Sequence, residues 1–108
     1  MTEDEITILS AKAVGLKVGY SNNFGGYSVG EPYSKGEYEW NPIFSDRDTM
    51  HLICEKKINV SHGRDFVSAT VFRPTIHIKL HVTDDLDRDN QIKLAVATCA
   101  AEIGKSMP

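Results

Sequence analysis

Two segments of alternating apolar residues, Phe66–Phe72 and Thr75–Val82, are separated only by Arg73-Pro74, and they restrict the fold more than any other part of the chain. β-Branched and aromatic residues that alternate with polar ones indicate half-buried strands. A connection this short joins neighbouring strands that run antiparallel. The sequence therefore predicts a hairpin centred on Arg73-Pro74.

The expected register separates the two faces of this hairpin by polarity. One face is wholly apolar, and its opposed pairs are Val71 with Ile76, Ala69 with Ile78, and Val67 with Leu80. The other face is half polar, and its pairs are Thr70 with His77, Ser68 with Lys79, and Phe66 with His81. A slip of one residue would turn charged side chains into the core, so we expect this register and no other.

Three helices are expected beside the strands. The first begins after Thr2, which forms a capping box with Glu5, and Gly15 is placed to end it. The second should run from about Asp46 to Lys57 and turn three residues to the core, namely Met50, Ile53 and Cys54. The third opens within the acidic run 84–89 and has an apolar stripe formed by Ile92, Val96, Cys99, Ile103 and Met107.

Two further strands are expected near residues 17–21 and 26–30 or somewhat later, around an Asn- and Gly-rich turn, and residues 59–65 are expected to contain a Ser-His-Gly turn. The order of elements is then α-β-β-α-β-β-α. A chain of 108 residues suits one domain. The sequence predicts a single α+β domain over 1–108, an α/β sandwich in which a four-stranded, mostly antiparallel sheet packs with three helices.

Composition argues against several classes of partner. Fifteen acidic residues against 12 basic ones give a net charge of -3, without the concentrated basic face that nucleic acid requires. No apolar run approaches the roughly 18 residues that span a bilayer, and the acidic start of the chain is unlike a signal peptide. We expect a soluble protein with no membrane partner. Cys54 and Cys99 are expected to be reduced, buried thiols.

Six of the nine aromatic residues lie between Tyr20 and Trp40, where acids outnumber the single base, Lys35. Such a charge balance repels a phosphate backbone, whereas Tyr gives a large contact area at a small entropic cost. We predict a protein-contact surface formed by Tyr20, Phe24, Tyr27, Glu31, Tyr33, Glu37, Tyr38 and Glu39.

Three other patterns invite a chemical interpretation, and each fails a test of geometry. The alternating aspartates of 85–89 begin like a calcium loop, but Asn90 stands where that loop needs glycine. His77 and His81 share a strand face about 13 Å apart, too far for one ion. The stretch Ser61–Asp65 has the letters of a catalytic triad, which adjacent residues cannot align. We expect no catalytic, cofactor-binding or metal-binding residues.

Four places in the chain resemble the phage ABA-sandwich domain family, which groups small phage and prophage proteins. They are Ala11-Lys12-Ala13-Val14-Gly15-Leu16; Trp40-Asn41-Pro42 followed by Asp46 and Asp48; the strand pair; and Ala100-Ala101-Glu102-Ile103-Gly104. The resemblance implies an α/β sandwich, structural roles for Trp40 and the two aspartates, and no catalytic residues. It also implies a location in the cytoplasm of a bacterial host.

The leading prediction is a non-enzymatic phage or prophage accessory protein that binds a host or phage protein through residues 20–40. One specific form is inhibition of a bacterial defence system, in which the acids occupy the basic groove of a nucleic-acid-binding complex. Two alternatives stay open. One is a nucleic-acid-associated module that uses Arg73, His77, Lys79 and His81 on the polar sheet face, and the other is a small enzyme with an unrecognised site. A homodimer stays open as well.

Overall fold

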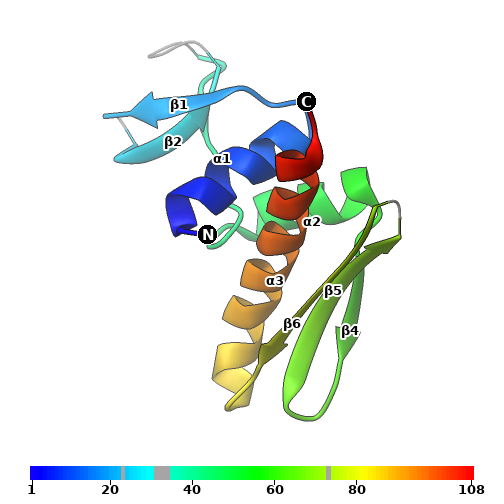
Figure 1. The fold of residues 1–108 in the computed structure, drawn as a ribbon. Coiled ribbons are helices and arrows are strands. Elements are labelled where there is room, and N and C mark those ends of the chain that lie inside the picture. Colours follow the sequence, from blue (N-terminus) through cyan, green and yellow to red (C-terminus); the bar gives the residue numbers. More distant parts are fainter. Residues whose placement is uncertain (23, 31–34, 73) are drawn as a thin grey trace.

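The computed structural model describes residues 1–22, 24–30, 35–72 and 74–108, which form one compact α+β domain (Figure 1). The helices are α1 (Glu3–Ala13), α2 (Asp46–Lys56) and α3 (Asp85–Ser106). One antiparallel sheet has the order β1 (Val18–Ser21), β2 (Gly26–Val29) and β3 (Tyr38–Glu39). The other has the order β4 (Asn59–His62), β5 (Phe66–Phe72) and β6 (Thr75–His81).

The prediction of one four-stranded sheet is wrong, because each strand pair has a third strand of its own. β3 pairs with β2, and β4 pairs with β5 inside the stretch 59–65, where a turn but no strand was expected. The helices also keep the sheets apart. Figure 1 shows β5 and β6 along α3, whereas β1 and β2 lie on the side of α1 that is far from β5 and β6. The two strand pairs therefore belong to separate three-stranded sheets.

The register expected for the second hairpin is confirmed at all six pairs, from Phe66 opposite His81 to Val71 opposite Ile76. Val67, Ala69 and Val71 are buried on the apolar face, against which α3 packs. The opposite face of β6 is exposed to solvent. The polarity of the two faces, rather than strand propensity alone, therefore identified the pairing.

α3 lies at the centre of the core. Its middle is almost completely buried at Ala95, Val96, Ala97, Cys99, Ala100 and Ala101. The expected stripe is confirmed for Val96, Cys99 and Ile103, but Met107 follows the end of the helix and is exposed. Small side chains allow close approach of α1, and a Cβ atom added to Gly104 would overlap the backbone carbonyl of Leu9. Close α1–α3 contact thus depends on residue size at this crossing.

The ends of the first helix follow the sequence signals. Thr2 Oγ1 accepts a hydrogen bond from the backbone N–H of Glu5 at 3.2 Å, and the Glu5 carboxylate accepts one from the backbone N–H of Thr2 at 3.3 Å. These bonds confirm the capping box, and the one from the Thr2 backbone is the largest cause that holds the pKa of Glu5 below its ordinary value. Gly15 follows the helix with φ +76°, as expected of a residue that ends it.

The core face predicted for α2 is partly wrong. Met50 and Cys54 are exposed and Ile53 is half-buried, whereas Leu52 is fully buried. The buried face instead includes Asp48 and Thr49, because both bind the preceding turn: Asp48 Oδ2 accepts from the Asn41 N–H, and Thr49 Oγ1 donates to the Pro42 carbonyl, each at 2.8 Å. Two satisfied polar side chains therefore set the rotation of this helix.

Candidate functional site

Trp40 stands between two clefts and has a structural role. Its side chain is buried, and its Nε1 donates to the carbonyl oxygen of Thr7 over 3.1 Å. Its backbone N–H donates to the Tyr27 carbonyl over 2.9 Å, and its ring meets the His51 ring edge to face with centroids 6.1 Å apart. The side chain and backbone of this one residue thus fix α1, β2 and α2 relative to one another, and with them the walls of both clefts.

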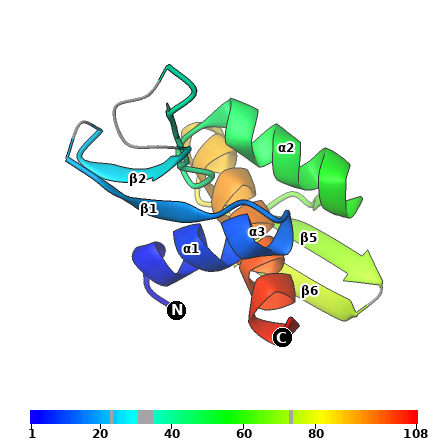
Figure 2. The same cartoon turned by 90° about the horizontal axis from the view of Figure 1, so that it is seen from above.

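The first cleft, which we name the acidic cleft, lies between the β1–β2 hairpin, the start of α1 and the segment that leads into α2. Its volume is about 280 Å³. The lining residues are Glu3, Asp4, Thr7, Tyr20, Gly25, Gly26, Tyr27, Glu39, Trp40, Asn41, Ile43 and Phe44. In Figure 2 the hairpin and α1 lie side by side, so residues distant in the sequence meet there.

Aromatic rings form the exposed part of this cleft. The register of β1 and β2 places Tyr20 opposite Tyr27, and their rings meet edge to face with centroids 6.0 Å apart. Tyr20 is 67% exposed and Phe44 is 62% exposed. Exposed rings of this size in a concave site are a feature of binding surfaces rather than of the core.

Three carboxylates converge on the same cleft from two elements. Glu3 and Asp4 belong to the first turn of α1, where the helix dipole favours negative charge, and Glu39 comes from β3. Among the described residues, those that line the cleft include no Lys or Arg. Within the described ranges, the ion pairs of the protein involve none of these three acids. The acidic cleft therefore combines negative charge with accessible aromatic faces.

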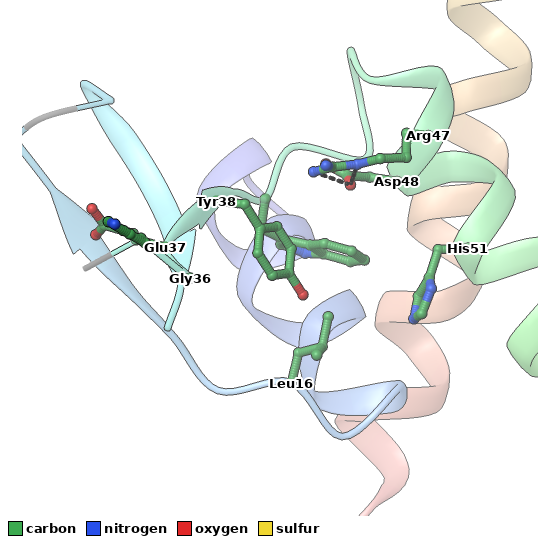
Figure 3. A pocket seen from close by; sticks show the side chains of 9 residues that line it. Leu16, Gly36, Glu37, Tyr38, Arg47, Asp48 and His51 are labelled. Atoms are coloured by element: carbon green, nitrogen blue, oxygen red, sulfur yellow. Dashed lines mark hydrogen bonds and ion pairs between the residues drawn. The ribbon is translucent and has the colours of Figure 1, made fainter. Parts of the chain in front are cut away.

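The second cleft, which we name the aromatic cleft, lies on the α2 side of Trp40 and has a volume of about 360 Å³. Its lining residues are Leu16, Lys35, Gly36, Glu37, Tyr38, Trp40, Arg47, Asp48 and His51. Figure 3 shows Leu16, Tyr38 and His51 around the opening, with Arg47 and Asp48 on one side of it. Apolar and aromatic groups make up most of its wall.

Polar groups in the aromatic cleft are largely engaged in fixed contacts. The Arg47 guanidinium lies 5.1 Å from the Tyr38 ring centroid, donates to the Glu39 carbonyl at 3.1 Å and pairs with Asp48 at 3.2 Å. Glu37 accepts a hydrogen bond from Ser28 Oγ at 2.8 Å and points away from the opening in Figure 3. Arg47 therefore links the start of α2 to β3 on this side of the cleft.

The predicted contact residues do not form one surface. Three of them line the acidic cleft, namely Tyr20, Tyr27 and Glu39. Glu37 and Tyr38 line the aromatic cleft, and Phe24 is exposed within the turn between β1 and β2 without lining either cleft. Glu31 and Tyr33 lie outside the described residues. The predicted segment is thus divided between two sides of Trp40.

Sequence reasoning missed several members of these clefts. Glu3 and Asp4 carried only the signal of a helix start, and they sit far from the aromatic segment in the sequence. Phe44 follows Pro42 and Ile43 without the periodicity of a helix or strand. His51 has no spacing from other polar residues that would indicate a binding site. Glu3, Asp4 and Phe44 come together only in the folded chain, where α1, the β1–β2 hairpin and the segment before α2 line the same cleft.

The structure also places the residues that the sequence suggested as metal ligands or as a nucleic-acid-binding face. Within 1–22, 24–30, 35–72 and 74–108, no three His, Cys, Asp or Glu side chains gather as a metal site would require. His77, Lys79 and His81 are exposed on the outer face of β6, and Lys79 lies 4.3 Å from the Phe66 ring centroid. Arg73 lies outside the described residues. Along the described chain, no helix has the length and apolar character for a membrane crossing.

Comparison with known proteins gives no match, either to a protein-family model, to a curated protein or to a solved structure. The resemblance to the phage ABA-sandwich domain family therefore stays a prediction. An inference about function therefore depends on the geometry of the acidic cleft and the aromatic cleft.

Proposed function

We propose that this chain is a non-enzymatic protein-binding module that holds a basic segment of a partner protein in its acidic cleft. The observation that carries the proposal is the convergence of Glu3, Asp4 and Glu39 beside the Tyr20–Tyr27 pair. A nearby Phe44 extends the apolar surface.

Arg and Lys side chains suit this combination of groups. Carboxylates accept charge-assisted hydrogen bonds from a guanidinium or ammonium group, and tyrosine faces attract the same cation. The alkyl stem of either side chain can cover an exposed ring such as Tyr20 or Phe44. An anionic segment would instead meet three carboxylates, and the described lining residues offer it no Lys or Arg.

Helix capping accounts for part of the acidity but not for all of it. Acids in the first turn stabilise α1 through its dipole, which explains Glu3 and Asp4 without a partner. Glu39 belongs to β3 and makes no such contribution, yet it lines the same cleft. The rings of Tyr20 and Phe44 remain exposed, although burial of either would favour folding. A partner that covers these groups explains their joint placement.

The more specific form of the proposal is the phage or prophage accessory role in the cytoplasm of a bacterial host. A nucleic-acid-binding host complex has a groove rich in Lys and Arg, which is the chemistry that the acidic cleft would accept. Inhibition of a defence complex by occupation of such a groove would use Glu3, Asp4 and Glu39. This form rests on the family resemblance together with the charge of the cleft.

Binding of a short peptide with two Arg and one Leu tests the proposal, with a Gln-for-Arg version of the same peptide as the reference. We expect the double variant Tyr20→Ala/Glu39→Gln to bind the Arg peptide about tenfold more weakly than the unmodified chain. The matched control is Phe72→Ala/Glu55→Gln. Phe72 is 67% exposed, like Tyr20, and Glu55 is exposed on α2.

Circular dichroism shows whether both double variants are folded. If the two folded variants bind the Arg peptide with equal affinity, the proposal is contradicted, because binding then depends only on the net charge of the protein. Equal binding of the Arg and Gln peptides would contradict it as well. An affinity for single-stranded DNA that falls steeply with salt would favour the nucleic-acid alternative.

A further inference from the structure

β6 is the outer strand of its sheet, and its outer edge is unpaired within the described part of the chain. In Figure 2, β5 lies between α2 and β6. The strand runs over seven residues from Thr75 to His81 and contains neither Pro nor Gly. A strand of this kind offers a row of backbone donors and acceptors to another strand.

The hydrogen-bond pattern identifies which residues of β6 face outward. Val82 donates its N–H to the Asp65 carbonyl at 2.8 Å, so in this antiparallel register Ile76, Ile78 and Leu80 direct their backbone groups toward β5. Residues between them direct theirs away from the sheet. The N–H and C=O groups of His77, Lys79 and His81 therefore form the open edge.

Two independent contacts agree with this assignment. Gly63 donates to the Phe66 carbonyl at 2.9 Å, which turns the even-numbered residues of β5 toward β4 and leaves the odd-numbered ones for β6. Gln91 of α3 donates from Nε2 to the His81 carbonyl at 2.8 Å, so that carbonyl indeed points away from β5. Gln91 also covers this end of the edge. His77 and Lys79 are left with uncovered backbone groups on the strand.

We infer that this edge pairs with the β6 edge of a second copy of the chain, antiparallel and around a two-fold axis at Ile78. In this register His77 of each copy lies opposite Lys79 of the other copy. The four outward groups of His77 and Lys79 then all find partners. The His81 carbonyl keeps its bond to Gln91.

The side chains fit the same register. On the helix side of the sheet, Ile78 would meet its own copy and Ile76 would meet Leu80, and these three residues are only partly buried in the single chain. Leu94 lies three residues after Gln91, on the same face of α3, and is partly buried as well. A second copy would therefore complete the burial of the apolar layer that α3 and β6 already share.

This pairing is self-complementary, which is what a two-fold interface requires. On the outer face the facing groups are Lys79 of one copy and His77 of the other, and Thr70 Oγ1 lies 2.7 Å from His77 Nδ1 within its own chain. The strands β4, β5 and β6 contain no Asp or Glu. The two-fold register thus brings His77 and Lys79 of different copies side by side on the outer face, and none of the three strands places a carboxylate beside them.

Analytical ultracentrifugation over about 10 µM to about 1 mM tests the inference. We expect the mass to rise from 12.0 kDa toward twice that value with concentration. His77→Pro should stay at 12.0 kDa, because it removes an outward N–H and no bond to β5, while the matched control His77→Thr should still dimerise. A wild-type chain that stays monomeric over this range would overturn the inference.

Amide hydrogen exchange of the wild-type chain tests the register and does not depend on the folding of the proline variant. Exchange should slow at His77 and Lys79 with rising protein concentration, whereas Ile76, Ile78 and Leu80 exchange slowly throughout. Fast exchange at His77 and Lys79 in a dimer would overturn the register.

Discussion

The Trp40 Nε1 and the carbonyl oxygen of Thr7 lie 3.1 Å apart, and this hydrogen bond ties the loop between β3 and α2 to α1. Because Trp40 is buried and lines both clefts, its removal should loosen the core and the clefts together. We expect Trp40→Ala to lower the free energy of unfolding by about 3–5 kcal/mol. Trp40→Phe, which keeps a ring but loses the donor, should cost less.

Urea denaturation followed by circular dichroism measures both values. A loss below about 1 kcal/mol for Trp40→Ala would contradict the structural role of this side chain.

The crossing of α1 and α3 gives a second prediction, at Gly104. A methyl group there would meet the backbone of Leu9, which cannot move without shifting α1. Gly104→Ala should therefore destabilise the fold by about 2–4 kcal/mol, although alanine favours helix elsewhere. Gly19→Ala is the matched control, since a Cβ atom added there meets nothing within 4 Å. A stabilised Gly104→Ala variant in thermal denaturation would contradict the close approach.

The two cysteines should differ in reactivity. Burial raises the pKa of the Cys99 thiol to about 11, and Glu102 adds to the shift, whereas Cys54 is exposed. A thiol reagent should modify Cys54 in the native protein and reach Cys99 only on unfolding. Mass spectrometry of the labelled native chain measures this, and labelling of Cys99 at the rate of Cys54 would contradict the burial.

The raised pKa of Cys99 also predicts a pH dependence of stability. A group whose pKa is higher in the folded state favours folding below its ordinary value of 9.0, and that contribution is lost as the pH rises toward about 11. The unfolding free energy of the wild type should therefore fall more between these pH values than that of Cys99→Ala. Parallel curves for the two proteins would contradict the shift.

Local signals in the sequence predicted local structure well. The capping box at Thr2 and Glu5, the end of α1 at Gly15 and the register of β5 with β6 depend on neighbouring residues or on one short turn. The prediction of which α2 residues face the core was wrong, because Asp48 and Thr49 are buried by hydrogen bonds to the turn before the helix. An apolar pattern in the sequence does not indicate such bonds.

Long-range relationships were beyond the sequence. The two-residue strand β3 is too short to show alternation, so the sequence did not indicate that the expected strands near 17–21 and 26–30 gain a third strand in a sheet of their own. Tyr20, Tyr27 and Glu39 were identified in the segment, but Glu3 and Asp4 join them only through the packing of the hairpin beside α1. A site built from two distant segments has no local signature until the fold is known.

The most direct measurement of the central proposal is a map of amide NMR shifts on addition of the Arg peptide. We predict that the changes gather at residues of the acidic cleft, including Glu3, Tyr20, Tyr27 and Glu39, while the exposed acid Glu55 on α2 is unaffected. Changes spread over all exposed acids in proportion to charge, or confined to the outer face of β6, would contradict a basic segment bound in the acidic cleft.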